Sequence, residues 1–357
     1  MSIVWVLWGY SLAFGTGNAF IGDFSHFGLS GIAFASAEGE DIPPLLFVAF
    51  QMMFAVITPA LITGAFAERF KFSTYLIFLV IWSTVVYSPI THWVWASNGW
   101  LWELGALDFA GGTVIHINAG IAAVAASLIV GKRRNPGLQP NNVPYVILGA
   151  AILWFGWFGF NAGSALAAGD SAANAFLVTS LAASTAALTW GVISHLKTGK
   201  MGAVGVATGA VAGLVAITPA AGAVNAMGSL AIGFGAGLIC FYAVELLHKT
   251  NMDDALDVFA VHGIGGIWGA IATGIFATSL ITGGTTGLIE DGNIKQVGIQ
   301  AVGVIATLVY SGVVSLIILF ILDKIPGLGL RADEADEDLG LDLASHGEQA
   351  TVRDGAD

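Results

Sequence analysis

Apolar segments of about twenty residues recur along almost the whole chain and constrain its fold more than any other feature. A helix of that length crosses a hydrocarbon core of roughly 30 Å, whereas the strands of a membrane barrel would alternate in polarity over about ten residues. The sequence therefore predicts an all-α integral membrane protein, a polytopic helical bundle of about ten spans. We place the spans at 3–21, 44–66, 73–95, 109–131, 144–165, 173–195, 202–219, 224–247, 257–280 and 298–323.

The composition excludes a soluble globular protein. Hydrophobic residues make up 56% of the chain and charged residues 10%, which leaves too few polar side chains to cover a water-exposed surface. The single cysteine, Cys240, lies within a predicted span and has no partner for an intramolecular disulfide.

Basic residues mark alternate loops and orient the bundle. Of the twelve Lys and Arg residues, eleven fall in every second loop or in the C-terminal tail, and Lys295 falls on the other side. The eleven are Arg69, Lys71, Lys132, Arg133, Arg134, Lys197, Lys200, Lys249, Lys324, Arg331 and Arg353. Because loops rich in Lys and Arg stay inside, the loops 67–72, 132–143, 196–201 and 248–256 are expected in the cytoplasm, with the tail. We expect a multi-pass protein of the cell (plasma) membrane.

Two regions follow from this distribution of charge. Residues 1–325 are expected to form one transmembrane domain in the lipid bilayer, and residues 326–357 an acidic cytoplasmic tail. The net charge of −12 is carried mostly by the tail and by external loops. The tail has little apolar surface to bury, so we expect it to be solvated, and its acidity argues against nucleic acid as a partner.

Two histidines occur at equivalent positions of an internal repeat. Asp108 precedes His116 by eight residues, and Asp254 precedes His262 by the same interval. The two helices enter the membrane from opposite sides, as expected for an inverted repeat with its functional site near the midplane. Eight helical residues rise about 12 Å, close to half of a ~30 Å core. Both histidines should therefore meet near the centre of the bilayer.

Paired imidazoles at that depth indicate a functional site, because ionisable groups are costly inside a membrane. They could ligate a haem, bind a transition metal, or line a narrow pore for small polar solutes or protons. A metal would lack a Cys or carboxylate to complete its shell, and Gly263, Gly265 and Gly266 imply tight helix contact where haem needs a broad slot. With no nucleophile–base pairing in the sequence, we expect neither an enzyme nor a cofactor.

Aromatic residues beside polar groups favour the pore. Trp95 ends the third span on its outer side, and Phe54 lies within the second span. Phe160 lies in GWFGFNAGS, which ends at Ser164. An outward-facing aromatic cup with one hydroxyl suits a small cation, which gains about 1–2 kcal/mol for each desolvated ring face. The carboxylate of Asp108 adds negative potential near this cup.

Several segments resemble, in order, those of ammonium transporters of the Amt/Mep/Rh superfamily, and they cover essentially the whole chain. They are GYSLAFG (9–15), TGAFAERFKFSTYLIF (63–78), DFAGGTVIHINAGIAAVAASLIVGKR (108–133), GWFGFNAGS (156–164), AGLVAITPAAG (212–222), DVFAVHGIGGIWG (257–269) and GLDLASHGEQA (340–350). The resemblance implies a homotrimer in which each subunit has its own pore.

The resemblance also implies an outer ammonium recruitment site. Phe54, Trp95 and Ser164 would form this site, and Asp108 would organise it without touching the substrate. Below it, Phe54 and Phe160 would form a stacked gate.

His116 and His262 would be the pore histidine pair of the family. Ammonium would lose its proton near the gate, and ammonia would pass the two imidazoles. The alternative is an ammonium sensor of the same fold, which conducts little and signals through its C-terminal tail.

Two departures from the family pattern matter. The family has eleven spans, and MSIVWVLWGYSLAFG resembles its second helix, so we expect that the natural protein has one further span upstream of this sequence. The tail resembles the regulatory segment at which a PII-type signal protein docks, but Thr351 stands where the family typically has a tyrosine. That difference weakens the expectation of PII regulation.

Overall fold

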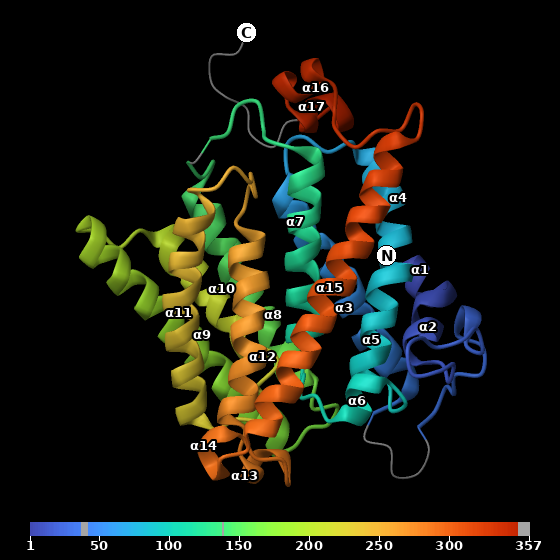
Figure 1. Ribbon diagram of the computed structural model, residues 1–357, viewed down its shortest axis with the longest axis vertical. Coiled ribbons are helices and arrows are strands. Elements are labelled where there is room, and N and C mark those ends of the chain that lie inside the picture. Colours follow the sequence, from blue (N-terminus) through green and yellow to red (C-terminus); the bar gives the residue numbers. More distant parts are fainter. Residues whose placement is uncertain (37–41, 138, 349–357) are drawn as a thin grey trace.

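The computed structural model describes residues 1–36, 42–137 and 139–348, and within these ranges it is a helical bundle whose only β-pairings are isolated bridges (Figure 1). Eight helices are long and apolar enough to cross a membrane, and the apolar helices Ser2–Phe14 and Ala203–Ile217 are shorter. Each of the ten predicted spans overlaps one of these helices. The prediction of an all-α polytopic bundle is confirmed.

Several of the long helices contain a π-helical turn. In chain order the membrane helices are α1 (Ser2–Val4) with η1 (Trp5–Gly9) and α2 (Tyr10–Phe14), α3 (Pro44–Phe66), α4 (Phe72–Trp82) with η3 (Ser83–Tyr87) and α5 (Ser88–Trp95), η4 (Gly112–Ile117) with α7 (Asn118–Val130), α8 (Val143–Gly163), α9 (Asp170–Thr198), α10 (Ala203–Ile217), α11 (Ala226–Leu247), η5 (Phe259–Gly263) with α12 (Ile264–Phe276), and α15 (Ile294–Lys324). The short helices are η2 (Phe27–Leu29), α6 (Trp100–Leu104), α13 (Ser279–Thr282), α14 (Leu288–Asp291), α16 (Glu334–Leu339) and α17 (Leu341–His346).

The first span ends earlier than predicted. α2 stops at Phe14, whereas the apolar run predicted a helix to residue 21. Gly15 is extended, with φ −66° and ψ 161°, and the N–H of Gly22 donates to the carbonyl of Leu12. The chain therefore doubles back on the end of its own helix. A Cβ at either glycine would overlap neighbouring backbone, which explains why this turn needs glycine at both positions.

The loops 67–72 and 248–256 lie at the end of the bundle that carries α16 and α17 (Figure 1, top). Arg133 joins two of these loops, because its side chain pairs with Asp253 at 2.8 Å and with Glu68 at 3.3 Å. Arg134 pairs with Glu334 of the tail at 2.7 Å. Three of the four predicted basic loops and the tail therefore lie together.

The C-terminal segment is more ordered than a solvated tail. Residues 334–346 form α16 and α17, and the N–H of Ala332 donates to the carbonyl of Arg69 at 2.9 Å. Arg331 and Glu337 form an ion pair of 2.8 Å within this segment. Residues 349–357, which include Thr351, lie outside the described residues.

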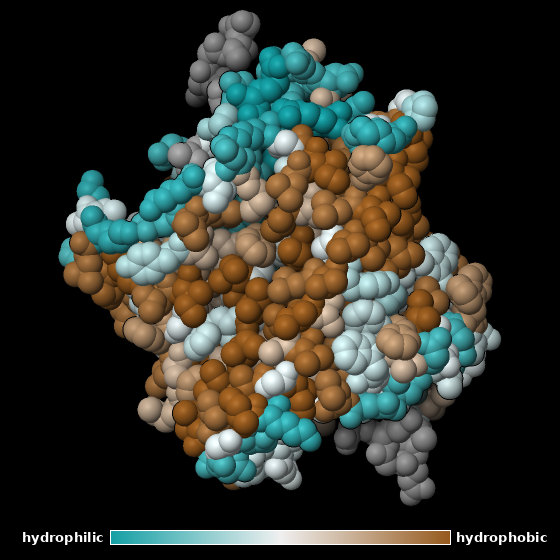
Figure 2. Space-filling view, in the orientation of Figure 1, coloured by the Kyte–Doolittle hydropathy of each residue, from teal (hydrophilic) through white to brown (hydrophobic). Residues whose placement is uncertain are grey.

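Hydrophobic residues cover the middle of the face shown in Figure 2, and hydrophilic residues gather at both ends. The helix α8 is the extreme case, since only 6% of its most apolar stretch is buried within the subunit. Leu148, Ile152 and Phe155 are among its exposed side chains. An apolar surface of this extent is stable in contact with lipid or with another protein, but not in contact with water.

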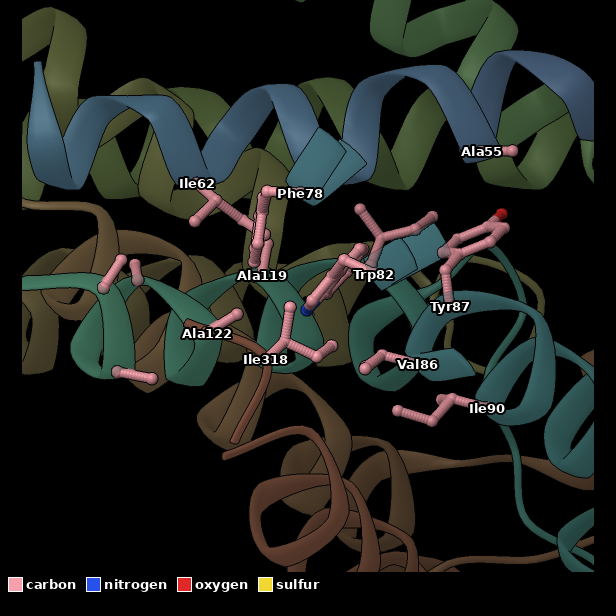
Figure 3. Close-up of a cluster of buried hydrophobic side chains, with 14 of the residues drawn as sticks. Ala55, Ile62, Phe78, Trp82, Val86, Tyr87, Ile90, Ala119, Ala122 and Ile318 are labelled. Atoms are coloured by element: carbon pink, nitrogen blue, oxygen red, sulfur yellow. The ribbon is translucent and has the colours of Figure 1, made fainter. Parts of the chain in front are cut away.

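The largest buried cluster supports α7 (Figure 3). Trp82 of α4 packs there with Ile62 of α3, Ala119 of α7 and Ile318 of α15. Trp82 also donates an indole hydrogen bond of 2.8 Å to the hydroxyl of Ser315 on α15. The helix that continues from His116 is therefore held between α3, α4 and α15.

Candidate functional site

The helix that carries His116 begins on a buried carboxylate. Asp108 accepts hydrogen bonds of 2.6 to 3.1 Å from the four backbone N–H groups of residues 111–114. These groups open η4 and have no partner within the helix, so the carboxylate satisfies them and sits at the positive end of the helix dipole. Both oxygens of Asp108 are thereby occupied, which agrees with a role in organising the site.

Asp254 occupies the equivalent position in the second half of the repeat. It accepts a hydrogen bond of 2.7 Å from the N–H of Phe259, five residues on, as Asp108 does from Thr113 at 2.9 Å. Asp254 lies in the loop before η5, and burial raises the pKa of its carboxyl to about 6. The two halves of the bundle therefore start their histidine helices in the same way, from opposite ends of the molecule.

The structure brings the two predicted histidines into contact. The Nδ1 atoms of His116 and His262 lie 3.2 Å apart, and their rings are nearly parallel, with centroids 5.2 Å apart and planes 21° apart. At that distance one Nδ1 donates a hydrogen and the other accepts it, so the pair shares a single proton between the rings.

Both histidines lie in π-helical turns, η4 and η5. Turns of this kind interrupt α-helices and are frequent at functional sites. Glycines let the two helices approach at this level, since a Cβ on Gly120 would overlap the backbone of Gly263 and one on Gly266 would lie 3.1 Å from the Cβ of His116. The tight contact expected around Gly263 and Gly266 is confirmed.

Trp157 is a neighbour of the pair that the sequence analysis missed. Its ring lies parallel to that of His116, with centroids 5.4 Å and planes 16° apart, and its indole N–H donates to the hydroxyl of Thr218 at 2.9 Å. Trp157 precedes Phe160 by three residues in GWFGFNAGS, so both lie on one face of α8. That spacing was a usable signal, but eleven tryptophans gave no reason to select this one.

The two phenylalanines of the predicted gate are in contact. The ring centroids of Phe54 and Phe160 lie 4.7 Å apart with planes 66° apart. They therefore meet edge to face and are not stacked face to face. Phe160 also lies 5.1 Å from Trp157 and 6.0 Å from His116. The predicted gate pair is thus in contact with the aromatic rings beside His116.

An open cavity of about 330 Å³ lies on the other side of this gate. Trp95, Asp108 and Ser164 line it, together with Phe50 and other residues. Phe54 is 2% exposed and lies behind this lining, with its ring 5.5 Å from that of Trp95. The structure therefore brings the predicted recruitment residues together at one cavity and its floor.

Hydrogen bonds fix the polar groups of this cavity. The indole N–H of Trp95 donates to the backbone carbonyl of Asp108 at 2.8 Å. The hydroxyl of Ser164 donates to the carbonyl of Phe160 at 2.9 Å, so its oxygen can accept a hydrogen bond from a ligand. The cavity thus offers an acceptor and aromatic surface, which suits a small cation with N–H donors.

Comparisons with known proteins identify the family of this chain. The Ammonium Transporter Family model matches residues 1–351. An ammonium transporter of Aquifex aeolicus is 51% identical over 356 residues, which is 98% of this chain and 82% of that protein.

Solved structures give the same result. The crystal structure of Candida albicans Mep2 matches with a TM-score of 0.88 and 41% identity over 94% of this chain and 76% of that one. A structure described as a sensor Amt protein matches with a TM-score of 0.86 and 33% identity over 96% of this chain and 86% of that one. The chain therefore belongs to the ammonium transporter family, a family of membrane transporters with several spanning helices.

Proposed function

We propose that this protein transports ammonium across the membrane by recruiting the cation at the outer cavity and conducting ammonia past the histidine pair. The observation that carries the proposal is an unbroken run of ring contacts from the cavity to the pair. It passes from Trp95 to Phe54, then to Phe160, and from there to His116 and His262.

The cavity suits the charged form of the substrate. Each desolvated ring face contributes about 1–2 kcal/mol to the binding of a cation, and the hydroxyl oxygen of Ser164 accepts one of its hydrogens. Asp108 adds negative potential while its oxygens remain committed to backbone N–H groups. Ammonium, which is close to potassium in size, is thereby recognised by its donors as well as by its charge.

The region below the gate suits the neutral form. An ion in an apolar passage loses its hydration at a cost of several kcal/mol, whereas neutral ammonia loses little. The facing Nδ1 atoms of His116 and His262 share one proton. Of their two Nε2 atoms, one therefore carries a hydrogen and the other is an acceptor, so the pair provides both a donor and an acceptor for a small solute or a proton. Ammonium therefore gives up its proton near the gate, and ammonia passes the imidazoles. The proton either returns to the outside or crosses separately through the histidine pair.

The double variant His116→Ala with His262→Ala tests this mechanism. Removing both rings lets hydrated cations enter the pore, so selectivity for ammonium over potassium is expected to be lost. The measurement is uptake of each cation by proteoliposomes that contain a monodisperse oligomer of the variant. Unchanged selectivity against potassium in the double variant would contradict the mechanism, and Met53→Leu on the exposed side of α3 is the control.

We further propose that the protein is a homotrimer with one pore in each subunit. The proposal is supported by the family and by the exposed apolar face of α8. Native mass spectrometry of the protein in detergent should give a mass of three chains, and a stable monomer that transports ammonium would contradict it.

We infer that the protein lies in the plasma membrane with its C-terminus in the cytoplasm. The basic loops and the tail lie at one end of the bundle, which supports this orientation.

A PII-type signal protein is the proposed partner of that end. Pull-down with a purified PII-type protein tests it, and no binding under any nucleotide condition would exclude this partner.

A sensor is the second candidate function. It is favoured by the similarity to the structure described as a sensor Amt protein. A sensor would bind ammonium but conduct little of it. Ammonium-dependent stabilisation of the purified protein, without alkalinisation of ammonium-treated proteoliposomes, would favour the sensor over the transporter.

A further inference from the structure

Thr218 is a buried residue of the membrane domain to which the transport mechanism assigns no function. It directly follows the last residue of α10 and is fully buried. Its hydroxyl donates to the carbonyl of Leu214 at 2.7 Å and accepts the indole N–H of Trp157 at 2.9 Å. Because the hydroxyl hydrogen points at Leu214, the lone pairs of the oxygen are directed elsewhere, and the indole N–H takes one of them.

The indole that Thr218 holds lies against His116. The two rings are 16° from parallel with their centroids 5.4 Å apart, and both residues are buried. Nε2 of His116 has no hydrogen-bond partner among the described residues. The position of this imidazole therefore depends on the rings packed against it and on the contact of its Nδ1 with His262.

The end of α10 also contacts the start of the His116 helix. The backbone carbonyl of Thr218 accepts a hydrogen bond of 3.2 Å from the N–H of Ala110. A Cβ on Gly112, the first residue of η4, would lie 2.5 Å from the ring of Pro219. Thr218 is therefore fixed relative to the helix that carries His116, and it can hold the indole in a constant place beside that helix.

Two polar contacts attach α8 to the bundle, and they provide a comparison. In this helix, every residue of which the structure describes, only Trp157 and Asn161 are buried. Asn161 donates to the hydroxyl of Thr179 on α9 at 2.9 Å, as Trp157 does to Thr218. Both contacts hold the same helix, but it is the Trp157 ring that stacks on His116. Thr179 is thus a matched control for Thr218.

We propose that Thr218 is a positioning residue for transport, whose hydroxyl holds the indole of Trp157 against His116 and so keeps the histidine pair aligned. This inference rests on the proposed function and deepens it. Without the hydroxyl, the buried indole N–H loses its acceptor, and the ring turns or shifts toward another one. His116 then loses the surface on which it packs, and its 3.2 Å contact with His262 is no longer maintained.

Two substitutions separate the hydroxyl from the shape of the side chain. Thr218→Val removes the acceptor and keeps the branched shape, whereas Thr218→Ser keeps the hydroxyl. The loss of a buried acceptor should lower the maximal rate of vesicle alkalinisation by about tenfold in Thr218→Val. The KM for ammonium should stay within about twofold of that of the parent protein, because the outer cavity is unchanged. Thr218→Ser should keep at least about half of the parent rate.

Two further variants test whether Thr218 acts through the indole. Thr179→Val breaks the other polar contact of α8 and should leave the maximal rate within about twofold of the parent rate. In Trp157→Phe, which has no indole N–H, adding Thr218→Val should change the rate by less than about twofold. Thr218→Ala replaces Thr218→Val if the latter yields no monodisperse oligomer. A parent-like rate without the hydroxyl, an equal fall in Thr179→Val, or the full tenfold fall in the Trp157→Phe background would overturn the proposal.

The position of the rings can be tested without transport, by nuclear magnetic resonance of protein with isotope-labelled tryptophan and histidine. The indole N–H signal that is missing from Trp157→Phe belongs to Trp157. This signal and those of the histidine pair should move in Thr218→Val and stay in place in Thr179→Val. Failure of the parent protein to alkalinise vesicles would refute the proposed transport, whereas unchanged signals in Thr218→Val would refute the role of Thr218.

Discussion

At the scale of single residues, the site depends on buried polar groups whose partners are almost completely specified. Asp108 satisfies four N–H groups, and the Nδ1 atoms of the two histidines satisfy each other, whereas Nε2 of His116 has no partner among the described residues. The sequence predicted these residues because a carboxylate and an imidazole are conspicuous in apolar segments. It did not predict Trp157, since an aromatic residue within a span is common, and only the folded position shows that this one lies beside His116.

Replacement of Asp108 should affect both stability and transport. Asp108→Ala leaves the N–H groups of residues 111–114 without their acceptor, and each buried donor left unsatisfied costs about 1–3 kcal/mol. We expect a clearly lower melting temperature and loss of ammonium uptake. Asp170→Ala, at the exposed start of α9, is the control and should change stability by less than about 0.5 kcal/mol. Normal uptake by Asp108→Ala would contradict the assigned role.

At the scale of elements, the sequence predicted the helices well and their interruptions poorly. Apolar length located every span, because a helix in lipid must be long and apolar. The end of α2 at Phe14 depends on glycines that form a tight turn, and hydropathy does not distinguish such a turn from a helix. The π-helical turns η4 and η5 were also missed, since they follow from tertiary packing of the two histidine helices.

The crossing of these two helices should not tolerate a larger side chain. In Gly120→Ala the added methyl would overlap the backbone of Gly263, so the helices must separate and the histidine pair must move. We expect ammonium uptake to fall at least about tenfold, with a lower melting temperature. Gly298→Ala on the exposed side of α15 has open space for the methyl group, so ammonium uptake and the melting temperature should stay unchanged. Equal activity of the two variants would refute this packing argument.

The start of the second histidine helix should make stability depend on pH. The pKa of Asp254 is raised to about 6 from 3.8 by burial. Between about pH 4 and pH 6 the folded protein therefore binds this proton more tightly than the unfolded chain does, and stability falls as the pH rises through that window. The loss amounts to about 3 kcal/mol when complete. The melting temperature of Asp254→Asn should vary less over this range than that of the parent protein, and an identical profile would contradict the assignment.

At the scale of the whole molecule, the alternation of basic loops and the inverted repeat together predicted the topology. Three of the basic loops meet the tail at one end, where Arg133 and Arg134 pair with carboxylates of neighbouring loops and of the tail. What the sequence could not show is the pairing itself. Arg133, for example, was predicted as a marker of orientation, whereas the structure shows it bridging two loops.

That bridge should contribute to stability. Only 10% of the Arg133 side chain and 12% of the Asp253 side chain are exposed. Although burial raises the pKa of Asp253, hydrogen bonds from Arg133 outweigh it and lower that pKa overall. Arg133→Met leaves this carboxylate without its partner and should destabilise the protein by about 1–3 kcal/mol. Lys249→Met at an exposed position of the same end is the control, and equal melting temperatures of the two variants would exclude a stabilising role.

The central claim is that this bundle selectively conducts ammonium, and one measurement tests it directly. An ammonium pulse is applied to proteoliposomes that contain the monodisperse oligomer, while current and internal pH are recorded together. The account predicts a saturable response to ammonium that potassium does not produce, seen as a current or as internal alkalinisation. The absence of both signals from a folded oligomer, or an equal current with potassium, would contradict it.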